Sequence, residues 1–292
     1  MFRGAITALV TPFRNGRVDE ERLRALVDQQ VAAGIDGIVP CGTTGESPTL
    51  SHEEHDRVVA IVVEQAKGRT KVIAGTGSNA TEEAVRLTRH AQEVGADGAL
   101  LVSPYYNRPT QEGLYQHFRR IAREAKGFPL VLYNIPGRTG VNILPETMAR
   151  LAEIENIVGV KEATGNLTQA IETLHRCPKG FVMLSGDDIL TLPLLAVGAV
   201  GVISVSANII PADVKACVDA WAAGRPEEAK RWHDRMVPIH QAMFVETNPA
   251  PVKTAMAMLG MIEGEIRLPL CGLSEANTEK LRAALRQYGL PA

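Results

Sequence analysis

Cysteine and long apolar runs are scarce in this sequence. Its four cysteines (Cys41, Cys177, Cys217 and Cys271) lie far apart and form no CxxC pair, so neither a zinc site nor a disulfide framework is expected. No segment reaches the roughly 18 consecutive apolar residues that a membrane-spanning helix needs. We therefore expect neither a cysteine-based metal centre nor a membrane protein.

A strong charge of either sign is also absent. The net charge is -2 and no basic run marks a nucleic-acid surface, so nucleic acid is not an expected partner. The opening stretch MFRGAITALVTPF is too short an apolar run for a secretory signal and leads directly into an expected strand. These features are typical of a globular protein, and we expect a cytoplasmic location.

Short apolar runs alternate with longer amphipathic segments along most of the chain. The runs are continuous and rich in β-branched residues, which is typical of parallel strands covered on both faces. The expected strands are Ala5–Val10, Gly37–Val39, Val72–Ala74, Ala99–Val102, Leu130–Leu132, Ile157–Val160, Phe181–Leu184 and Val202–Val205. The expected helices between them include Glu20–Ala33, Glu53–Ala66, Glu82–Val94 and Glu112–Ala125.

Repeated strand–helix units of this kind predict a (β/α)8 TIM barrel over residues 1–224. Ser51 and Glu54 have the spacing of a helix capping box, and Pro145 and Pro211 stand where helices should begin. Residues 225–292 show helical patterns without a convincing strand, so we expect a C-terminal helical region there. An open doubly wound sheet is the alternative, but the regular spacing of consecutive units favours closure.

Polar residues follow the expected strands, and in such barrels the carboxyl ends of the strands carry the active site. Lys161 directly follows the apolar run Ile157–Val160 and should project near the barrel axis. An ammonium group there is costly unless its pKa falls, and a lowered pKa supplies the neutral amine that a Schiff base needs. The alternative is a lysine that extends to solvent; we favour the nucleophile.

Tyr133 ends the preceding strand and is the natural proton carrier, with a hydroxyl from Thr43 or Thr44 as its hydrogen-bond partner. Tyr105 and Tyr106 fit an oligomer interface equally well. Arg138, on the next loop, suits bidentate capture of a carboxylate, although a surface arginine is an alternative. The segment Gly42–Gly45 offers backbone N–H groups to a second carboxylate.

Other chemistries find less support in the sequence. Asp187 and Asp188 end the seventh expected strand and would repel the phosphate that many barrels bind nearby. No Walker A, GxSxG or dinucleotide-binding motif is present. His52 and His55 lie one helical turn apart and could bind a metal with Glu53 or Glu54, but an exposed helix face is the more common explanation.

Together these motifs resemble the dihydrodipicolinate synthase / N-acetylneuraminate lyase family over essentially the whole chain. The matching motifs are Gly42–Glu46 (GTTGE), Tyr105–Pro109 (YYNRP), Tyr133–Pro136 (YNIP), Arg138–Gly140 (RTG), Gly159–Ala163 (GVKEA) and Gly201–Ser204 (GVIS). The resemblance implies a Schiff-base lyase that condenses pyruvate with L-aspartate 4-semialdehyde to 4-hydroxy-tetrahydrodipicolinate, in diaminopimelate and lysine biosynthesis. It implies no metal and no organic cofactor.

The resemblance also implies a role for each matching residue. Lys161 matches the Schiff-base lysine, Tyr133 the general acid/base, and Thr43 and Tyr106 the other members of a proton relay. The second tyrosine reaches the neighbouring subunit's site in the family, which implies a homo-oligomer, commonly a tetramer built as a dimer of dimers. Arg138 matches the arginine that holds the aldehyde's carboxylate. The remaining matches, at substrate-binding or entrance positions, are Thr44, Gly186, Ile203, Asp187, Asp188 and Asn248.

A second set of residues matches positions where feedback-sensitive members bind lysine at a dimer interface. These residues are Ser47, His52, His55, Asn79, Glu83 and Tyr105. A carboxylate such as that of Glu83 can pair with an ammonium group, so L-lysine is an expected effector. Pro48 departs from the small residue expected there, which would weaken inhibition.

Two further functions remain as alternatives at this point. One is a related pyruvate-dependent aldolase that acts on a sugar acid. The other is a noncatalytic amino-acid-binding relative, against which the intact Lys161, Tyr133, Thr43 and Arg138 speak.

Overall fold

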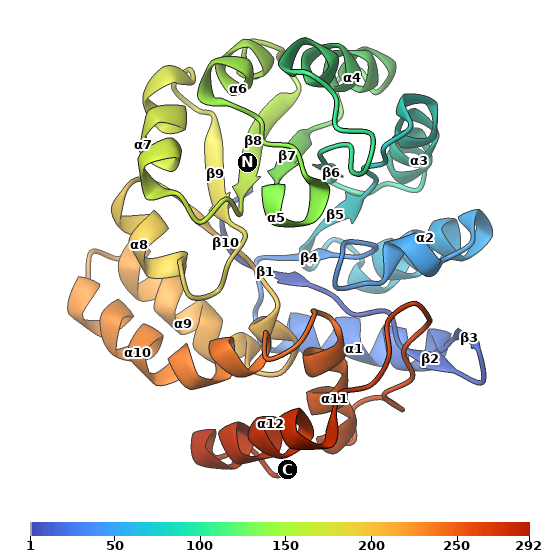
Figure 1. The fold of residues 1–292 in the computed structure, drawn as a ribbon, viewed down its shortest axis with the longest axis vertical. Coiled ribbons are helices and arrows are strands. Elements are labelled where there is room, and N and C mark those ends of the chain that lie inside the picture. Colours follow the sequence, from blue (N-terminus) through green and yellow to red (C-terminus); the bar gives the residue numbers. More distant parts are fainter. Residues whose placement is uncertain (1) are drawn as a thin grey trace.

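A closed barrel of parallel strands forms the centre of the molecule (Figure 1). The structure is a computed structural model that describes residues 2–292. Strands adjacent in the barrel are also consecutive in the chain, and β10 closes the ring against β1. The expected (β/α)8 barrel is confirmed, and the open doubly wound sheet is excluded.

The barrel strands lie within two residues of the expected apolar runs. They are β1 (Gly4–Ala8), β4 (Gly37–Val39), β5 (Lys71–Gly75), β6 (Gly98–Val102), β7 (Leu130–Asn134), β8 (Ile157–Glu162), β9 (Val182–Ser185) and β10 (Gly201–Ser204). Strands β7 and β8 run on past the expected ends because Tyr133 and Lys161 are themselves paired in the ladder.

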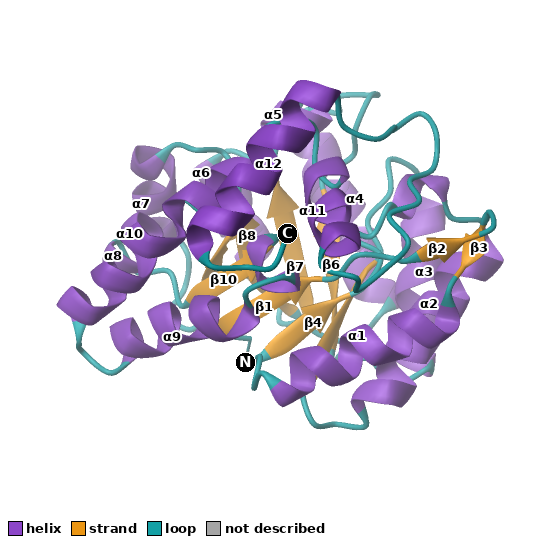
Figure 2. Ribbon diagram, turned by 90° about the horizontal axis from the view of Figure 1, so that it is seen from below, coloured by secondary structure: helices purple, strands orange, loops and turns teal. Residues whose placement is uncertain are grey.

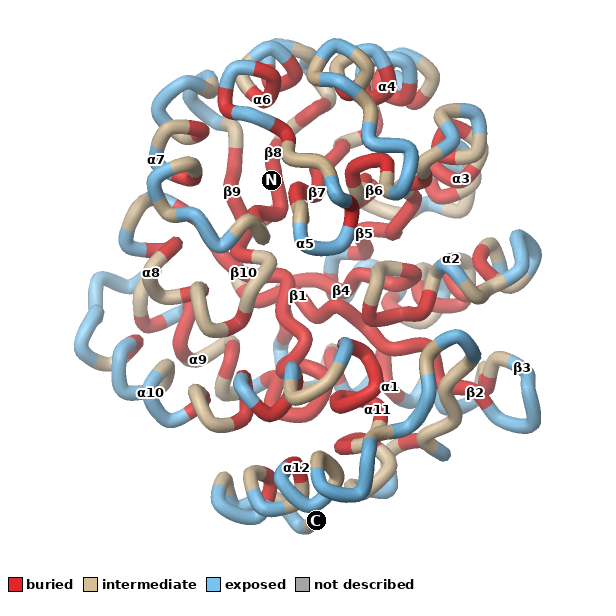
Figure 3. The backbone as a smooth tube through the Cα atoms, in the orientation of Figure 1, coloured by how far each residue is buried: buried red, intermediate tan, exposed pale blue. Residues whose placement is uncertain are grey.

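Helices surround the barrel on its outer side, as Figure 2 shows. They are α1 (Glu20–Ala32), α2 (His52–Ala66), α3 (Thr81–Glu93), α4 (Gln111–Glu124), α6 (Pro145–Ala152), α7 (Leu167–Arg176), α8 (Thr191–Ala196) and α9 (Pro211–Ala222). Ser51 and Glu54 form the expected capping box, and Pro145 and Pro211 stand in the first turns of α6 and α9. Each helix buries one face, so exposed residues lie mainly on the outer surface in Figure 3.

Three short elements stand at the carboxyl end of the barrel: α5 (Pro136–Thr139) and the 3-10 turns η1 (Ser47–Thr49) and η2 (Ser206–Asn208). A small hairpin, β2 (Phe13–Arg14) and β3 (Arg17–Val18), was not expected from the sequence. Its turn is Asn15–Gly16, and both residues have positive φ angles. An Asn–Gly pair is the usual signal for such a turn, so the sequence did contain it.

The barrel interior is filled with apolar side chains. Ile6, Ile73, Val131 and Ile203 belong to one buried cluster, to which Tyr133 also belongs. At the amino ends of the strands, the ring of Phe2 lies so close to Gly98 that an added Cβ would meet it at 2.6 Å. The interior is therefore a packed core and not a pore, and barrels of this kind carry their sites at the opposite, carboxyl rim.

The last part of the chain forms α10 (Pro226–Ala242), α11 (Ala250–Met258) and α12 (Glu275–Tyr288). Helix α10 packs against α9 and α12, and α12 lies outside the barrel helices in Figure 1. A domain division at residue 224 stays a prediction. Among residues 2–292, no helix combines the length and apolar character that crossing a membrane requires.

Candidate active site

Lys161 lies on β8 at the carboxyl rim of the barrel and is only 6% exposed. Asp188 acts on it through its charge, without a hydrogen bond to it. Burial lowers the pKa of Lys161 to about 8; Asp188 opposes this shift and Arg138 adds to it. At pH 7 roughly a tenth of such an amine is neutral, against about 0.04% for an ordinary lysine. Lys161 therefore has the properties of an amine nucleophile.

Tyr133 is the immediate neighbour of Lys161. The two residues pair across β7 and β8, and the Lys161 Nζ atom lies 4.2 Å from the centre of the Tyr133 ring. Burial raises the pKa of Tyr133 to about 12, while Arg138 and the Thr43 hydroxyl lower it and Asp187 raises it further. The phenol is thus protonated at neutral pH and stands beside the amine, where it can donate a proton.

Gly186 borders Lys161 from the position directly after the next strand, β9. A Cβ atom at this position would lie 3.1 Å from Lys161 Cε and 2.8 Å from the side chain of Ala163. Its backbone N–H donates to the carbonyl of Glu162 at 2.7 Å. Only glycine leaves room beside the amine, while Ile203, on β10, is buried in the barrel interior.

Arg138 is held by the C-terminal part of the chain. Its Nη2 atom donates to the backbone carbonyl of Asn248 at 3.1 Å, and the Asn248 amide donates to the Thr44 hydroxyl at 3.1 Å. The Oδ1 atom of Asn248 is buried and has no partner among the described residues. One chain of contacts therefore crosses the rim from Arg138 through Asn248 to Thr44. The Asn248 Oδ1 atom remains as a free acceptor within it.

Asp187 and Asp188 are both engaged by backbone groups. The Asp188 carboxylate accepts from the N–H groups of Val205 and Ser206, each at 3.0 Å, and Asp187 accepts from Ile189 at 3.0 Å. Asp188 is buried, so its charge acts on Lys161 through the protein interior.

A cavity of about 350 Å³ opens beside these residues. Its wall includes Thr43, Tyr133 and Arg138. Lys161 does not line it, but the Lys161 Nζ atom lies 4.2 Å from the centre of the Tyr133 ring. The same cavity is lined by most of the residues predicted for a lysine effector: Ser47, His52, His55, Glu83 and Tyr105. Asn79 stands next to them and donates to the Tyr105 carbonyl at 3.2 Å. The structure thus brings Thr43, Tyr133 and Arg138 to one cavity with most of the residues predicted for the lysine effector.

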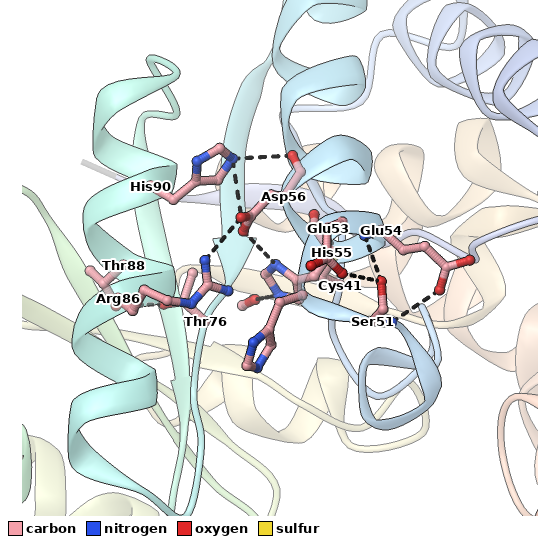
Figure 4. Close-up of polar contacts among 12 residues, drawn as sticks. Cys41, Ser51, Glu53, Glu54, His55, Asp56, Thr76, Arg86, Thr88 and His90 are labelled. Atoms are coloured by element: carbon pink, nitrogen blue, oxygen red, sulfur yellow. Dashed lines mark hydrogen bonds and ion pairs between the residues drawn. The ribbon is translucent and has the colours of Figure 1, made fainter.

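His52 and His55 have different surroundings. His52 Nε2 lies 2.7 Å from Glu83, whose other oxygen accepts from Ser78. His55 is buried, its Nε2 atom lies 2.9 Å from the Gly75 carbonyl, and burial lowers its pKa. Figure 4 shows that it adjoins a polar cluster around Asp56, between α2 and α3. Within residues 2–292, no group of three His, Cys, Asp or Glu side chains is placed to hold a metal ion.

Tyr106 does not join this site. It is 89% exposed and has a φ angle of +71°, whereas Lys161 and Tyr133 are buried. Within one chain Tyr106 therefore lies away from the cavity wall that Tyr133 and Thr43 form.

Two buried residues at the site were not singled out from the sequence. Glu46 follows the predicted threonines, and Lys253 lies on α11; their side chains are fully buried and 2.5 Å apart. The signal that could have found Lys253 is a single cation within the otherwise apolar segment Ala250–Met258.

Comparison with known proteins agrees with this geometry. The model of the dihydrodipicolinate synthetase family matches residues 1–288. The chain belongs to this family. The expectation of an enzyme of this family, a lyase, is confirmed.

Several relatives cover nearly the whole chain. A 4-hydroxy-tetrahydrodipicolinate synthase from Geotalea uraniireducens is 60% identical over 99% of this chain and 100% of its own. The crystal structure of dihydrodipicolinate synthase from Aquifex aeolicus is 53% identical, with a TM-score of 0.98 over 99% of both chains. A dihydrodipicolinate synthase from Cyanidioschyzon merolae, solved with lysine bound, is 44% identical with a TM-score of 0.96, also over 99% of both.

The Lys161 amine should become reactive as pH rises through about 8, because a lowered lysine pKa leaves more neutral amine at lower pH. Arg138→Met removes a nearby positive charge, so the pKa of Lys161 should rise and the reactive range should shift to higher pH. Labelling by a small acylating reagent across pH, with mass spectrometry of the Lys161 peptide, measures the pH at which labelling is half-maximal. The measurement is made on the wild-type protein and on Arg138→Met.

Arg225→Met is the matched control, because Arg225 pairs with Glu228 at the surface. It should leave the Lys161 midpoint unchanged. A wild-type midpoint near the ordinary lysine value of about 10.4 would contradict the assignment of Lys161 as the nucleophile.

Proposed function

We propose that this chain condenses pyruvate with L-aspartate 4-semialdehyde to give 4-hydroxy-tetrahydrodipicolinate, a step of diaminopimelate and lysine biosynthesis. The observation that carries the proposal is the buried Lys161 amine, with its pKa lowered to about 8, against the protonated Tyr133. The family and the names of its full-length relatives support the choice of substrates. A cytoplasmic location stays a prediction.

The chemistry begins at Lys161. Its neutral amine attacks the pyruvate carbonyl carbon, and loss of water gives a protonated imine. Removal of a methyl proton converts the imine to an enamine, whose carbon then attacks the aldehyde. The substrate's amino group finally adds to the imine carbon, closes the ring and releases Lys161. Tyr133 and Thr43 carry the protons, since the phenol stands beside the amine and the threonine acts on the phenol.

Carboxylate groups on both substrates need partners at the rim. Arg138 is the cation that lines the cavity with Tyr133, and its planar guanidinium suits the carboxylate of the aldehyde substrate. We assign the pyruvate carboxylate to Thr44 and the backbone N–H groups of Gly42–Gly45. Gly186 keeps space free beside Lys161, and Ile203 closes the apolar floor.

Lys161→Ala should reduce product formation from pyruvate and aspartate semialdehyde by roughly 1,000-fold or more, because the covalent step is lost. The wild-type protein treated with pyruvate and borohydride should gain one stable adduct on Lys161, detected by mass spectrometry. Lys230→Ala is the control, because Lys230 pairs with Asp234 at the surface. It should keep both product formation and adduct formation.

The outcomes also separate the alternative functions. Adduct formation with turnover only on a sugar acid would favour the related aldolase. Absence of any adduct in the wild-type protein would favour a noncatalytic binding protein and contradict the proposal.

We further propose that Tyr106 completes the active site of a neighbouring subunit, in a homo-oligomer that is commonly a tetramer. Its exposure of 89% and its separation from the cavity of its own chain support this assignment. Aromatic side chains are favoured at interfaces, where the exposed ring of Tyr106 would be buried.

Mixing two inactive variants tests this assignment. Tyr106→Phe should lower kcat by about 100-fold or more, because a proton-transfer group is lost. Mixed oligomers of Tyr106→Phe and Lys161→Ala should regain activity, since one site then contains both an intact Lys161 and the partner's Tyr106. Tyr115→Phe, on α4, is the control and should stay active. Mixed oligomers without any regained activity would contradict a shared site.

L-Lysine is proposed as an inhibitor that binds beside Ser47, His52, His55, Asn79, Glu83 and Tyr105. The lysine-bound structure of the 44%-identical relative supports this. Glu83 lines the cavity, and its pKa is lowered by hydrogen bonds from Ser78 and His52, so it is ionised and can pair with an ammonium group. Pro48 lines the same cavity, where the expected small residue would leave more space.

Glu83→Gln should weaken inhibition by lysine about 10- to 100-fold, because a hydrogen bond to a charged group contributes about 1.5–3 kcal/mol. The measurement is the lysine concentration that halves the rate, with kcat in the absence of lysine as the reference. Glu82→Gln, the neighbouring exposed residue of α3, should leave inhibition unchanged. Equal lysine sensitivity in the two variants would argue against this site.

A further inference from the structure

A fully buried ion pair connects the C-terminal helices to the loop that carries Thr43 and Thr44. The Lys253 Nζ atom lies 2.5 Å from Glu46 Oε1, and neither side chain is exposed. The same ammonium donates to the Thr11 carbonyl at 3.0 Å and lies 4.2 Å from the centre of the Phe13 ring. One cation therefore contacts the loop after β1, the loop after β4 and the first hairpin strand.

Glu46 is held at both of its carboxylate oxygens. Its Oε2 atom accepts from the backbone N–H of Arg267 at 3.1 Å. The Arg267 guanidinium binds Glu54 in the first turn of α2 and the Thr49 carbonyl, and its Cζ atom lies 4.1 Å from the centre of the Phe13 ring. Lys253 and Arg267, both in the C-terminal region, thus contact the segment 46–54 at several points.

The backbone beside the pair is in an unfavourable conformation. Glu46 has a φ angle of +52°, in the left-handed region that side-chain-bearing residues rarely occupy. Its N–H donates to the Thr43 carbonyl at 3.1 Å, and the Thr11 hydroxyl donates to the Gly45 carbonyl at 2.7 Å. The conformation at Glu46 therefore determines the path of the backbone through Thr43 and Thr44.

Stability alone does not account for this pair. Burying two charges is costly, and well-packed apolar residues usually serve at least as well for folding. Strained backbone that is held in place by its surroundings is concentrated at functional sites. Glu46 stands two residues after Thr44, which accepts from Asn248, and three after Thr43, which acts on Tyr133.

We propose that Lys253 and Glu46 are positioning residues that keep the hydroxyls of Thr43 and Thr44 in register with Tyr133 and the pyruvate carboxylate. This inference rests on the proposed function, because it assigns the pair to proton transfer on pyruvate bound to Lys161. Neither residue touches the substrate; both act through the loop conformation.

The test uses pyruvate alone, so that it does not depend on the identity of the aldehyde. Exchange of the pyruvate methyl protons with deuterated water, followed by NMR, reports proton removal from the Lys161 adduct. The rate is divided by the number of sites that pyruvate and borohydride label. The variants are Glu46→Gln, Lys253→Met and the double variant, which carries neither charge. Lys230→Met is the control, because its pair with Asp234 lies at the surface of α10.

Both single variants should exchange about 10- to 100-fold more slowly per labelled site, since a small displacement of catalytic groups has effects of this size. Thr43 lowers the pKa of Tyr133, so displacement of Thr43 should also move the alkaline limit of the exchange rate to higher pH. The control should match the wild-type protein in both measurements.

The double variant separates positioning from stability. Without unpaired buried charge it should recover a thermal midpoint close to that of the wild-type protein, whereas its exchange should stay slow. The double variant also tests the inference if a single variant does not fold. Wild-type exchange in the refolded, stable double variant, or exchange per site within two-fold in the single variants, would overturn the inference.

Failure of the proposed function is distinguishable from failure of this inference. Exchange by the wild-type protein without condensation would reject only aspartate semialdehyde as the acceptor. Absence of exchange in the wild-type protein would reject both the proposed function and the inference about Lys253 and Glu46.

Discussion

Removal of the Lys161 amine from water is the constraint on which the site depends. A closed barrel with a packed apolar interior places the end of β8 in a poorly hydrated environment, and there the charged form of lysine is disfavoured. Asp188 limits the shift, and Arg138 extends it. The result is a pKa of about 8, which leaves an amine that is reactive near neutral pH and still protonates after release.

Burial also lowers the pKa of Lys253, but there the charge of Glu46 opposes the shift. The Glu46 carboxylate lies 2.5 Å from the Lys253 ammonium and the Thr11 carbonyl lies 3.0 Å from it. Lys253 thus has a partner for its charge, and its contacts join two loops and the first hairpin strand. One buried lysine is left without an ion pair and is suited to chemistry; the other is paired and is suited to holding the loop that faces the first.

The C-terminal region belongs to the site as much as the barrel does. Asn248 contacts both Arg138 and Thr44, and Lys253 and Arg267 contact Glu46. In the proposed mechanism the barrel strands supply the nucleophile and the proton carrier, whereas the residues after α10 restrain the loops that would present carboxylate-binding groups. The contacts of Asn248 and Lys253 thus connect these loops to the segment that contains α11.

Much of this organisation is a consequence of local patterns in the sequence. Continuous apolar runs separated by amphipathic segments predicted the strands and the barrel, because both periodicities depend only on neighbouring residues. Lys161, Tyr133 and Arg138 were predicted at the rim because each follows or ends an apolar run, and parallel strands align their carboxyl ends. Contacts between distant segments have no such local signal. The Lys253–Glu46 pair spans 207 residues, Asn248 meets Thr44 across 204, and Tyr106 is left apart from its own site, so only the tertiary structure decided these arrangements.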